Sequence, residues 1–131
     1  MAITLLYASL LALWFVILSV QVIRYRGSHS IDLGDGGDTG MLRRIRAHGN
    51  FVDYAPLALI LMGLLEVSGA GPLLLHVIGG LLLVGRLAHG WALSFTDSSA
   101  LLRTGGIALT LAAIIIAAVR GLMIALDVGT F

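Results

Sequence analysis

The chain has 131 residues, of which 59% are hydrophobic and 11% are charged, and its formal net charge is +1. Its mean hydropathy of +1.03 is far above that of ordinary soluble domains, so the composition places the chain in a bilayer. All of its basic residues are arginines, and the near-neutral charge argues against a nucleic-acid partner, which requires a basic face. Cysteine is absent from the sequence, so any thiol chemistry needs a thiol from outside.

Four apolar runs are each long enough to cross a hydrocarbon core about 30 Å thick, which takes roughly 20 helical residues. We therefore expect a single all-α membrane domain over residues 1–131, with transmembrane helices at about 3–26, 41–67, 73–93 and 101–126. The first run has no positive charge before it, which favours a retained helix over a cleaved signal peptide.

The connections between these runs carry turn and cap signals. Residues 27–40 form a polar loop rich in glycine and aspartate, and residues 68–72 form a tight turn in which Pro72 suits the first position of a helix. Asp97 or Ser98 is expected to cap the fourth helix. The aspartates of the first loop lack the alternation and the closing glutamate of a calcium loop, so we expect no metal site.

The placement of arginine predicts the orientation in the membrane. Short loops rich in arginine stay in the cytoplasm. Five arginines flank the first loop and Arg103 lies beside the third, whereas the second turn has none. Both termini are therefore expected on the non-cytoplasmic side, with Arg120 as the exception to the pattern.

The start of the second helix carries polar groups into the membrane. Its polar residues recur at spacings of three and four and so share one helix face: Arg43, Arg46, Asn50, Asp53 and Tyr54. A charge near the hydrocarbon boundary costs a few kcal/mol unless it is paired or hydrated. An ion pair of the Arg46 to Asp53 type that only fixes packing is the simpler alternative. Four polar residue types on one face favour a functional role.

The third helix adds Arg86 and His89, one turn apart, and the fourth begins with Arg103 and Thr104. Together with arginines at the end of the first helix, these residues predict an electropositive pocket between helices, with Asp53 as its carboxylate. Arginine binds carboxylates through two parallel hydrogen bonds, a carboxylate holds an ammonium group, and an asparagine both donates and accepts. A small zwitterionic peptide suits these groups.

The segment R-A-H-G-N-F-V-D-Y-A-P, residues 46–56, resembles the helix-two signature of the MAPEG family, the membrane-associated proteins of eicosanoid and glutathione metabolism. The G-D-G-G sequence at residues 34–37 is similar to the loop of its bacterial branch, and the resemblance covers nearly the whole chain. It implies a homotrimer of four-helix subunits in the bacterial inner membrane. Glutathione, as co-substrate, would bind between neighbours at the cytoplasmic side, as in members that act as transferases, peroxidases or isomerases.

The resemblance also implies roles for individual residues. Four fall on the glutathione-binding positions of the second helix, with aspartate where glutamate is commoner: Arg46, Asn50, Asp53 and Tyr54. Arg24 is similar in place to the basic residue that closes the first helix. The segment G-R-L-A-H-G-W-A-L, residues 85–93, resembles the third helix of the prostaglandin synthase branch and adds Arg86 and His89 to the binding set.

Arg103 and Thr104 fall near the Arg–Ser pair of that branch, which makes Arg103 the predicted catalytic residue. A free thiol has a pKa of about 8.5, and a nearby arginine favours the charged, nucleophilic thiolate. The expected substrates are small hydrophobic electrophiles that partition into the membrane.

The chain departs from the family pattern at Leu93, where the well-studied eukaryotic enzymes have tyrosine, and at Gly49, where some members have another arginine. For this reason the eicosanoid substrates are not carried over. The alternative is a non-catalytic membrane protein that binds a lipid headgroup or another anionic metabolite in the same pocket. A small multidrug exporter, of similar length, relies on an acidic residue in its first helix, and the first apolar run here has no charge.

Two further patterns favour structural roles. Glu66, His76 and Arg120 fall toward the far ends of their helices and are expected to form a structural polar cluster. A small residue recurs at every fourth position of the last helix, at Ala113, Ala117 and Gly121, which permits close helix contact.

Overall fold

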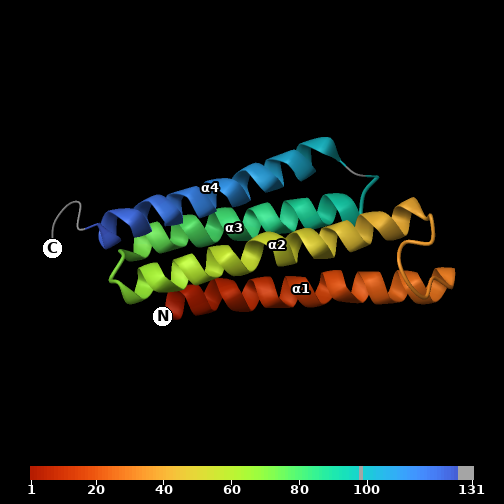
Figure 1. Cartoon of the computed structure of the whole chain (residues 1–131), viewed down its shortest axis with the longest axis horizontal. Helices are drawn as coiled ribbons and strands as arrows, with labels where there is room; N and C mark the ends of the chain where they lie inside the picture. The colour runs from red at the N-terminus through yellow and green to blue at the C-terminus, as the bar shows by residue number, and fades with distance from the viewer. Residues whose placement is uncertain (98, 127–131) are drawn as a thin grey trace.

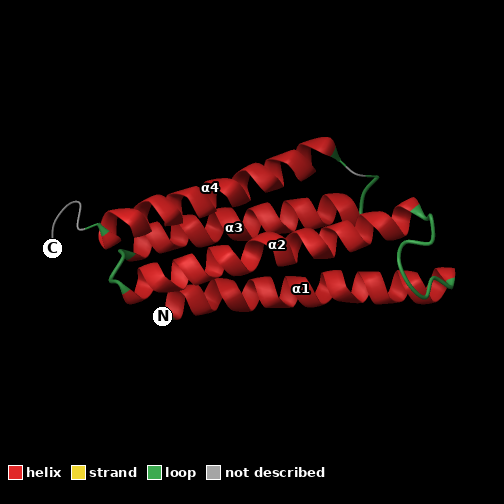
Figure 2. Cartoon of the chain, in the orientation of Figure 1, coloured by secondary structure: helices red, strands yellow, loops and turns green. Residues whose placement is uncertain are grey.

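The structure is a computed structural model that describes residues 1–97 and 99–126. Within these ranges the chain forms four helices: α1 (Ala2–His29), α2 (Thr39–Val67), α3 (Pro72–Ser94) and α4 (Ala100–Ala125) (Figure 1). Short loops join them (Figure 2). Each helix is long and apolar enough to cross a membrane, so the expected all-α, four-helix membrane fold is confirmed.

Successive helices run in opposite directions, so the start of α1 and the end of α4 lie at the same end of the bundle (Figure 1). This end, which also carries the turn between α2 and α3, is called the turn-side end, and the opposite end is called the loop-side end. The α1 and α4 helices each pack against both α2 and α3, and they lie on opposite sides of that central pair. Residues on α1 and α4 therefore do not meet within one chain.

The core lies along the helix contacts, where large apolar side chains are fully buried, among them Leu11, Met62, Ile78 and Leu82. Many other large apolar residues on the four helices face outward, including Leu13, Ile60 and Ile115. An apolar outer surface is costly in water but fits a hydrocarbon environment. The pattern of burial thus agrees with a membrane protein.

The helix ends agree with the sequence in part. Pro72 opens α3 as expected, and the Asp38 carboxylate accepts a hydrogen bond from the Met41 backbone N–H at 2.7 Å, which caps α2. The expected cap of α4 is wrong at Asp97, because Ser99 takes that position and its Oγ accepts from the Leu102 N–H at 3.5 Å.

The reason lies in the residue before the turn. Thr96 Oγ1 accepts a hydrogen bond from the Ser99 backbone N–H at 3.2 Å, which holds Ser99 at the start of the helix. Asp97 instead extends outward toward Arg43, with 4.0 Å between Oδ1 and the guanidinium NH1. Ser98, the other expected cap, lies outside the described residues.

The backbones of α3 and α4 approach each other closely at Gly85 and Gly106. A Cβ atom added to Gly85 would lie 2.7 Å from the Gly106 carbonyl oxygen, and one added to Gly106 would lie 2.6 Å from that of Gly85. Of the small residues expected to line α4, Ala113 and Ala117 are fully buried, whereas a Cβ on Gly121 would meet open space. The tightest α3–α4 contact is therefore nearer the loop-side end than expected.

Candidate functional site

Arg86 is the centre of a buried polar site although it carries a full charge. It lies in the middle of α3 and only 2% of it is exposed. Its Nε donates to Thr110 Oγ1 on α4 at 2.9 Å, and its NH1 donates to Asn50 Oδ1 on α2 at 2.6 Å and to the Asn50 carbonyl at 3.2 Å. One guanidinium group thereby connects three helices and fixes the direction of the Asn50 side chain.

Two aromatic residues complete the surroundings of Arg86. Trp14 of α1 donates from its ring N–H to the Arg86 carbonyl at 3.1 Å, and the Tyr54 ring centroid lies 5.6 Å from the guanidinium carbon. The NH2 atom of Arg86 is buried and has no hydrogen-bond partner within residues 1–97 and 99–126. This guanidinium therefore keeps both N–H groups of NH2 for a further acceptor.

His89 follows Arg86 by one helical turn and is 5% exposed. Its backbone packs against Gly106 of α4, where an added Cβ would come within 2.7 Å of the His89 nitrogen. The His89 side chain is thus buried on the same face of α3 as the Arg86 guanidinium.

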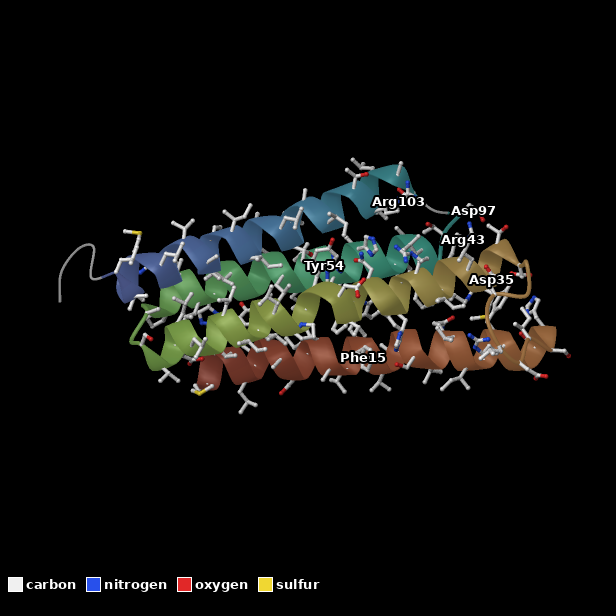
Figure 3. All side chains as sticks on the ribbon, viewed as in Figure 1. Phe15, Asp35, Arg43, Tyr54, Asp97 and Arg103 are labelled. Atoms are coloured by element: carbon white, nitrogen blue, oxygen red, sulfur yellow. The ribbon has the colours of Figure 1, made fainter. Side chains whose placement is uncertain are left out.

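The remaining charged residues of the predicted set face outward. Arg46, Asp53 and Arg103 are exposed, whereas Asn50 and Tyr54 are half-buried. Figure 3 shows Arg103 at the loop-side end of α4, which leans away from α3 there, and Tyr54 farther along the bundle. The described residues contain no ion pair between Arg46 and Asp53, so the simple packing pair considered from the sequence is not formed.

Asp53 is exposed far along a membrane-spanning helix. It follows Thr39, the first residue of α2, by fourteen positions, which corresponds to about 21 Å of helix. A carboxylate at such a depth costs a few kcal/mol when it faces lipid. The surface around Asp53 therefore requires water or a protein partner.

Arg24 is exposed on α1, on the side of the central pair opposite α4. One chain therefore does not place it with Arg103. The structure brings Asn50 and Tyr54 together with Arg86 and His89 of α3. The other predicted residues lie on the outer surface of the chain.

The structure shows the surroundings of Leu93 and Gly49, the two positions where the chain departs from the family pattern. Leu93 is 7% exposed and belongs to the hydrophobic core, so this position supplies packing and no hydroxyl group. Gly49 has open space where a Cβ would be, so its neighbours do not require a glycine there.

Sequence reasoning missed Thr110 and Trp14, the two residues that hold Arg86 from α4 and α1. A signal for Thr110 was present, since it is a hydrogen-bonding residue within a long apolar run. Trp14 is also informative, because it lies in the middle of its span and not at a helix end, where interfacial tryptophans gather.

The sequence profile of the MAPEG family matches residues 4–123, so the chain belongs to the MAPEG family. It is 43% identical over 84 residues to the protein named inner membrane protein YecN of Escherichia coli strain K12, and equally to the YecN protein of Escherichia coli O6:H1 strain CFT073. The alignment covers 64% of this chain and 64% of each relative, so the chain spans less than two thirds of their length. No solved structure matches the chain.

Proposed function

We propose that this chain, as a member of the MAPEG family, is an inner-membrane protein that binds glutathione and transfers it to small hydrophobic electrophiles in the bilayer, or uses it to reduce them. The observation that carries the proposal is the polar face of α2, where Asp53 is exposed deep in a membrane helix and Asn50 is fixed from behind by the buried Arg86. The relatives are named inner membrane proteins, which supports the location.

The exposed charges support an oligomer, and the family resemblance implies that it is a homotrimer. Arg46, Asp53 and Arg103 lie on membrane-spanning helices with part of their surface uncovered, and lipid is a poor neighbour for them. Arg24 lies on α1, on the side of the central pair opposite α4. In a head-to-tail ring, the α1 surface of one copy faces the surface of the next copy that carries Asp53 and Arg103. This contact would complete the site and cover the charges.

The arrangement divides the binding roles. Asn50 accepts from Arg86 with its carbonyl oxygen, which turns its amide N–H groups toward the ligand. Asp53 would hold the glutathione ammonium group, and Arg46 with Arg24 of a neighbouring copy would hold the carboxylates. Arg86 is a positioning residue that acts mainly through Asn50, while Tyr54 and His89 line the inner wall.

Arg103 would supply the chemistry. Its positive charge lowers the pKa of the bound thiol, so the proton leaves to solvent and a thiolate remains. In conjugation the sulfur forms a bond to the electrophilic carbon while the leaving group departs with its electron pair. In peroxide reduction the O–O bond breaks, two glutathione molecules become one disulfide, and the products are an alcohol and water.

An apolar groove on the α1 side of the bundle supports a hydrophobic second substrate. It measures 380 Å³, lies between α1 and α2, and is lined by residues that include Phe15, Phe51, Val52 and Pro56. Because α1 and α4 lie on opposite sides of the central pair, this groove is not beside Arg103 of the same chain. In the proposed ring, an electrophile in the groove would instead meet the thiol bound at the facing surface of the neighbouring copy.

The proposal includes an orientation in the membrane. Apart from Arg86 and Arg120, the arginines lie toward the loop-side end, which the positive-inside tendency places in the cytoplasm. Both termini would then be non-cytoplasmic, and the glutathione site would open toward the compartment that contains glutathione.

Leu93 favours a second candidate function. Because this position is buried and lacks a hydroxyl group, the site has one fewer donor for a thiolate than the tyrosine-containing enzymes that it resembles. In this alternative, the same pocket binds a lipid headgroup or another anionic metabolite without any reaction.

Calorimetric titration of glutathione into the detergent-purified protein tests the proposal. Asp53→Ala should abolish binding, and Asp32→Ala, which removes an exposed loop carboxylate, serves as the control. Conjugation of chlorodinitrobenzene by the same sample would make the protein an enzyme. Binding without conjugation would favour the non-catalytic candidate, and the absence of binding at millimolar glutathione would contradict the thiol site.

A further inference from the structure

A separate polar cavity of 380 Å³ lies at the loop-side end of the bundle. It is lined by Gln21 of α1, by Arg43 and Arg44 of α2, and by the segment from Ser94 to Asp97. None of the residues proposed to bind glutathione lines this cavity. It therefore calls for its own explanation.

Three residues that line the cavity carry donors that have no acceptor. Ser94 is 4% exposed, and its Oγ has no hydrogen-bond partner among the described residues. The Nε atoms of Arg43 and Arg44 are also buried and without a partner in the same part of the chain. Buried donors without an acceptor are costly and uncommon in native structures. All three belong to residues that line one cavity, which indicates a ligand rich in acceptor atoms.

The charge of the cavity favours an anion. Two guanidinium groups line it against one carboxylate, that of Asp97, whose side chain is fully exposed and only approaches Arg43 NH1 at 4.0 Å. Figure 3 shows Arg43 and Asp97 together at the loop-side end. Asp97 thus lies at the mouth of the cavity, and the interior keeps its positive charge.

Arg44 is held in place independently of any ligand. Its guanidinium carbon lies 4.1 Å from the Tyr25 ring centroid, and its NH1 donates to the Gly40 carbonyl at 3.0 Å. Stacking and hydrogen bonding together reduce the side-chain freedom that ligand binding would otherwise remove. The cavity is therefore organised before an anion binds.

The donor set and the position of the cavity suit phosphate. Guanidinium groups and hydroxyl donors arranged around a point match the several acceptor oxygens of phosphate. Next to the cavity, Trp91 and Phe95 stack at 4.6 Å between ring centroids and are both partly exposed, as aromatic residues are at a membrane–water interface. Basic pockets between helices at this depth bind anionic lipid headgroups.

We propose that this cavity binds a phosphate group, presented either by an anionic phospholipid headgroup or by a soluble phosphate. In both cases the phosphate oxygens accept hydrogen bonds from Arg43, Arg44 and Ser94. The site shares no residue with the proposed glutathione site. Phosphate binding can therefore be present or absent whether or not the protein binds glutathione.

Titration of the full-length protein with phosphatidylglycerol, followed by native mass spectrometry in detergent, tests the lipid source. Arg43→Gln should weaken binding about tenfold and Ser94→Ala about threefold, as expected for the loss of a charged and of a neutral hydrogen bond. Arg26→Gln removes a charge at the same end from a side chain that bonds to the Gly34 carbonyl outside the cavity, and it should leave binding within about twofold.

Calorimetric titration with inorganic phosphate tests the soluble source with the same variants. Phosphate binding that falls in Arg43→Gln and Ser94→Ala, with unchanged lipid binding, would assign the site to a soluble phosphate. Circular dichroism verifies folding, and the small Ser94→Ala change keeps the test decisive if Arg43→Gln does not fold. The proposal is overturned if the folded variants Arg43→Gln and Ser94→Ala bind both the lipid and phosphate as tightly as Arg26→Gln does.

Discussion

At the turn-side end, the Glu66 carboxylate of α2 accepts hydrogen bonds from the backbone N–H groups of Ile3 at 3.0 Å and Thr4 at 2.8 Å, at the start of α1. Toward the loop-side end, the Arg86 guanidinium is equally charged, but its NH2 is without a partner among the described residues. Both groups join helices, yet only Glu66 places both of its oxygens on backbone donors. A charge that the fold satisfies is structural, whereas one that keeps a buried donor is suited to binding.

A second pair of residues follows the same rule. At the turn-side end the Tyr7 hydroxyl lies 3.2 Å from His76 Nδ1, and their rings meet edge to face at 5.9 Å. His89, toward the other end, is buried one helical turn from Arg86. His76 thus serves the contact between α1 and α3 through Tyr7, and Glu66 likewise bonds to α1, in place of the cluster with Arg120 that was expected from the sequence. His89 belongs to the candidate site.

The largest effect is expected from Arg103→Ala. Removing the charge that stabilises a developing thiolate should lower kcat by about a hundredfold, while glutathione affinity falls only a few-fold. Arg120→Ala, on the turn-side half of the same helix, is the matched control and should change neither quantity appreciably. Steady-state kinetics with chlorodinitrobenzene and calorimetry measure the two effects. Equal losses in turnover and affinity would contradict the proposed division of roles.

The contact between α3 and α4 provides the next comparison. Gly106→Ala would press a Cβ against the Gly85 carbonyl and the His89 backbone, and we expect a loss of about 1–3 kcal/mol of stability. Gly121→Ala, where a Cβ meets open space, should be neutral or slightly stabilising, because alanine favours the helix. Thermal unfolding by circular dichroism measures both. Similar melting of the two variants would argue against the tight contact at Gly106.

Arg86 and Glu66 test the central comparison directly. Arg86→Leu leaves Asn50 without the donor that orients it, and glutathione affinity should fall about tenfold. Glu66→Gln removes only a structural charge and should lower the melting temperature while affinity stays unchanged. If Glu66→Gln weakened glutathione binding as much as Arg86→Leu, the two ends would not differ in function.

The smallest effect concerns pH and the cap of α2. The hydrogen bond from the Met41 backbone N–H holds the pKa of Asp38 below its usual range. A lowered carboxyl pKa stabilises the fold above the pKa of the unfolded chain, about 3.9, and this contribution disappears as the pH falls through the lowered value. Between pH 6 and pH 3, the melting temperature of the natural protein should therefore fall by a few degrees more than that of Asp38→Asn. Parallel pH curves for the two proteins would contradict this linkage.

Several features of the fold could be predicted because they depend on local patterns. Runs of about twenty apolar residues predict membrane helices regardless of packing, and Pro72 marks the start of α3 because its ring suits a first helical position. The cap of α4 could not be predicted in the same way. Several neighbouring polar residues could cap this helix. Ser99 does so because its backbone N–H bonds to Thr96 Oγ1, and this contact is not visible in the sequence pattern.

The candidate site was predicted as a set of residues, but not in its arrangement. Spacing placed Asn50 and Asp53 on one face of α2. It did not reveal that Arg86 points inward to hold Asn50, or that Thr110 and Trp14 hold Arg86 from two other helices. Such contacts join residues far apart in the chain, so periodicity within one helix carries no information about them.

The amino-acid sequence by itself determined that this is a four-helix membrane protein of the MAPEG family, because hydrophobic length and a contiguous motif are properties of the chain. Only the tertiary structure decided which charges are satisfied. It buried Arg86 against Asn50 and Thr110, left Asp53 exposed, and enclosed a polar cavity beside Ser94. The physical reason is that the cost of a charge in a membrane depends on its neighbours from other helices, which helix packing alone determines.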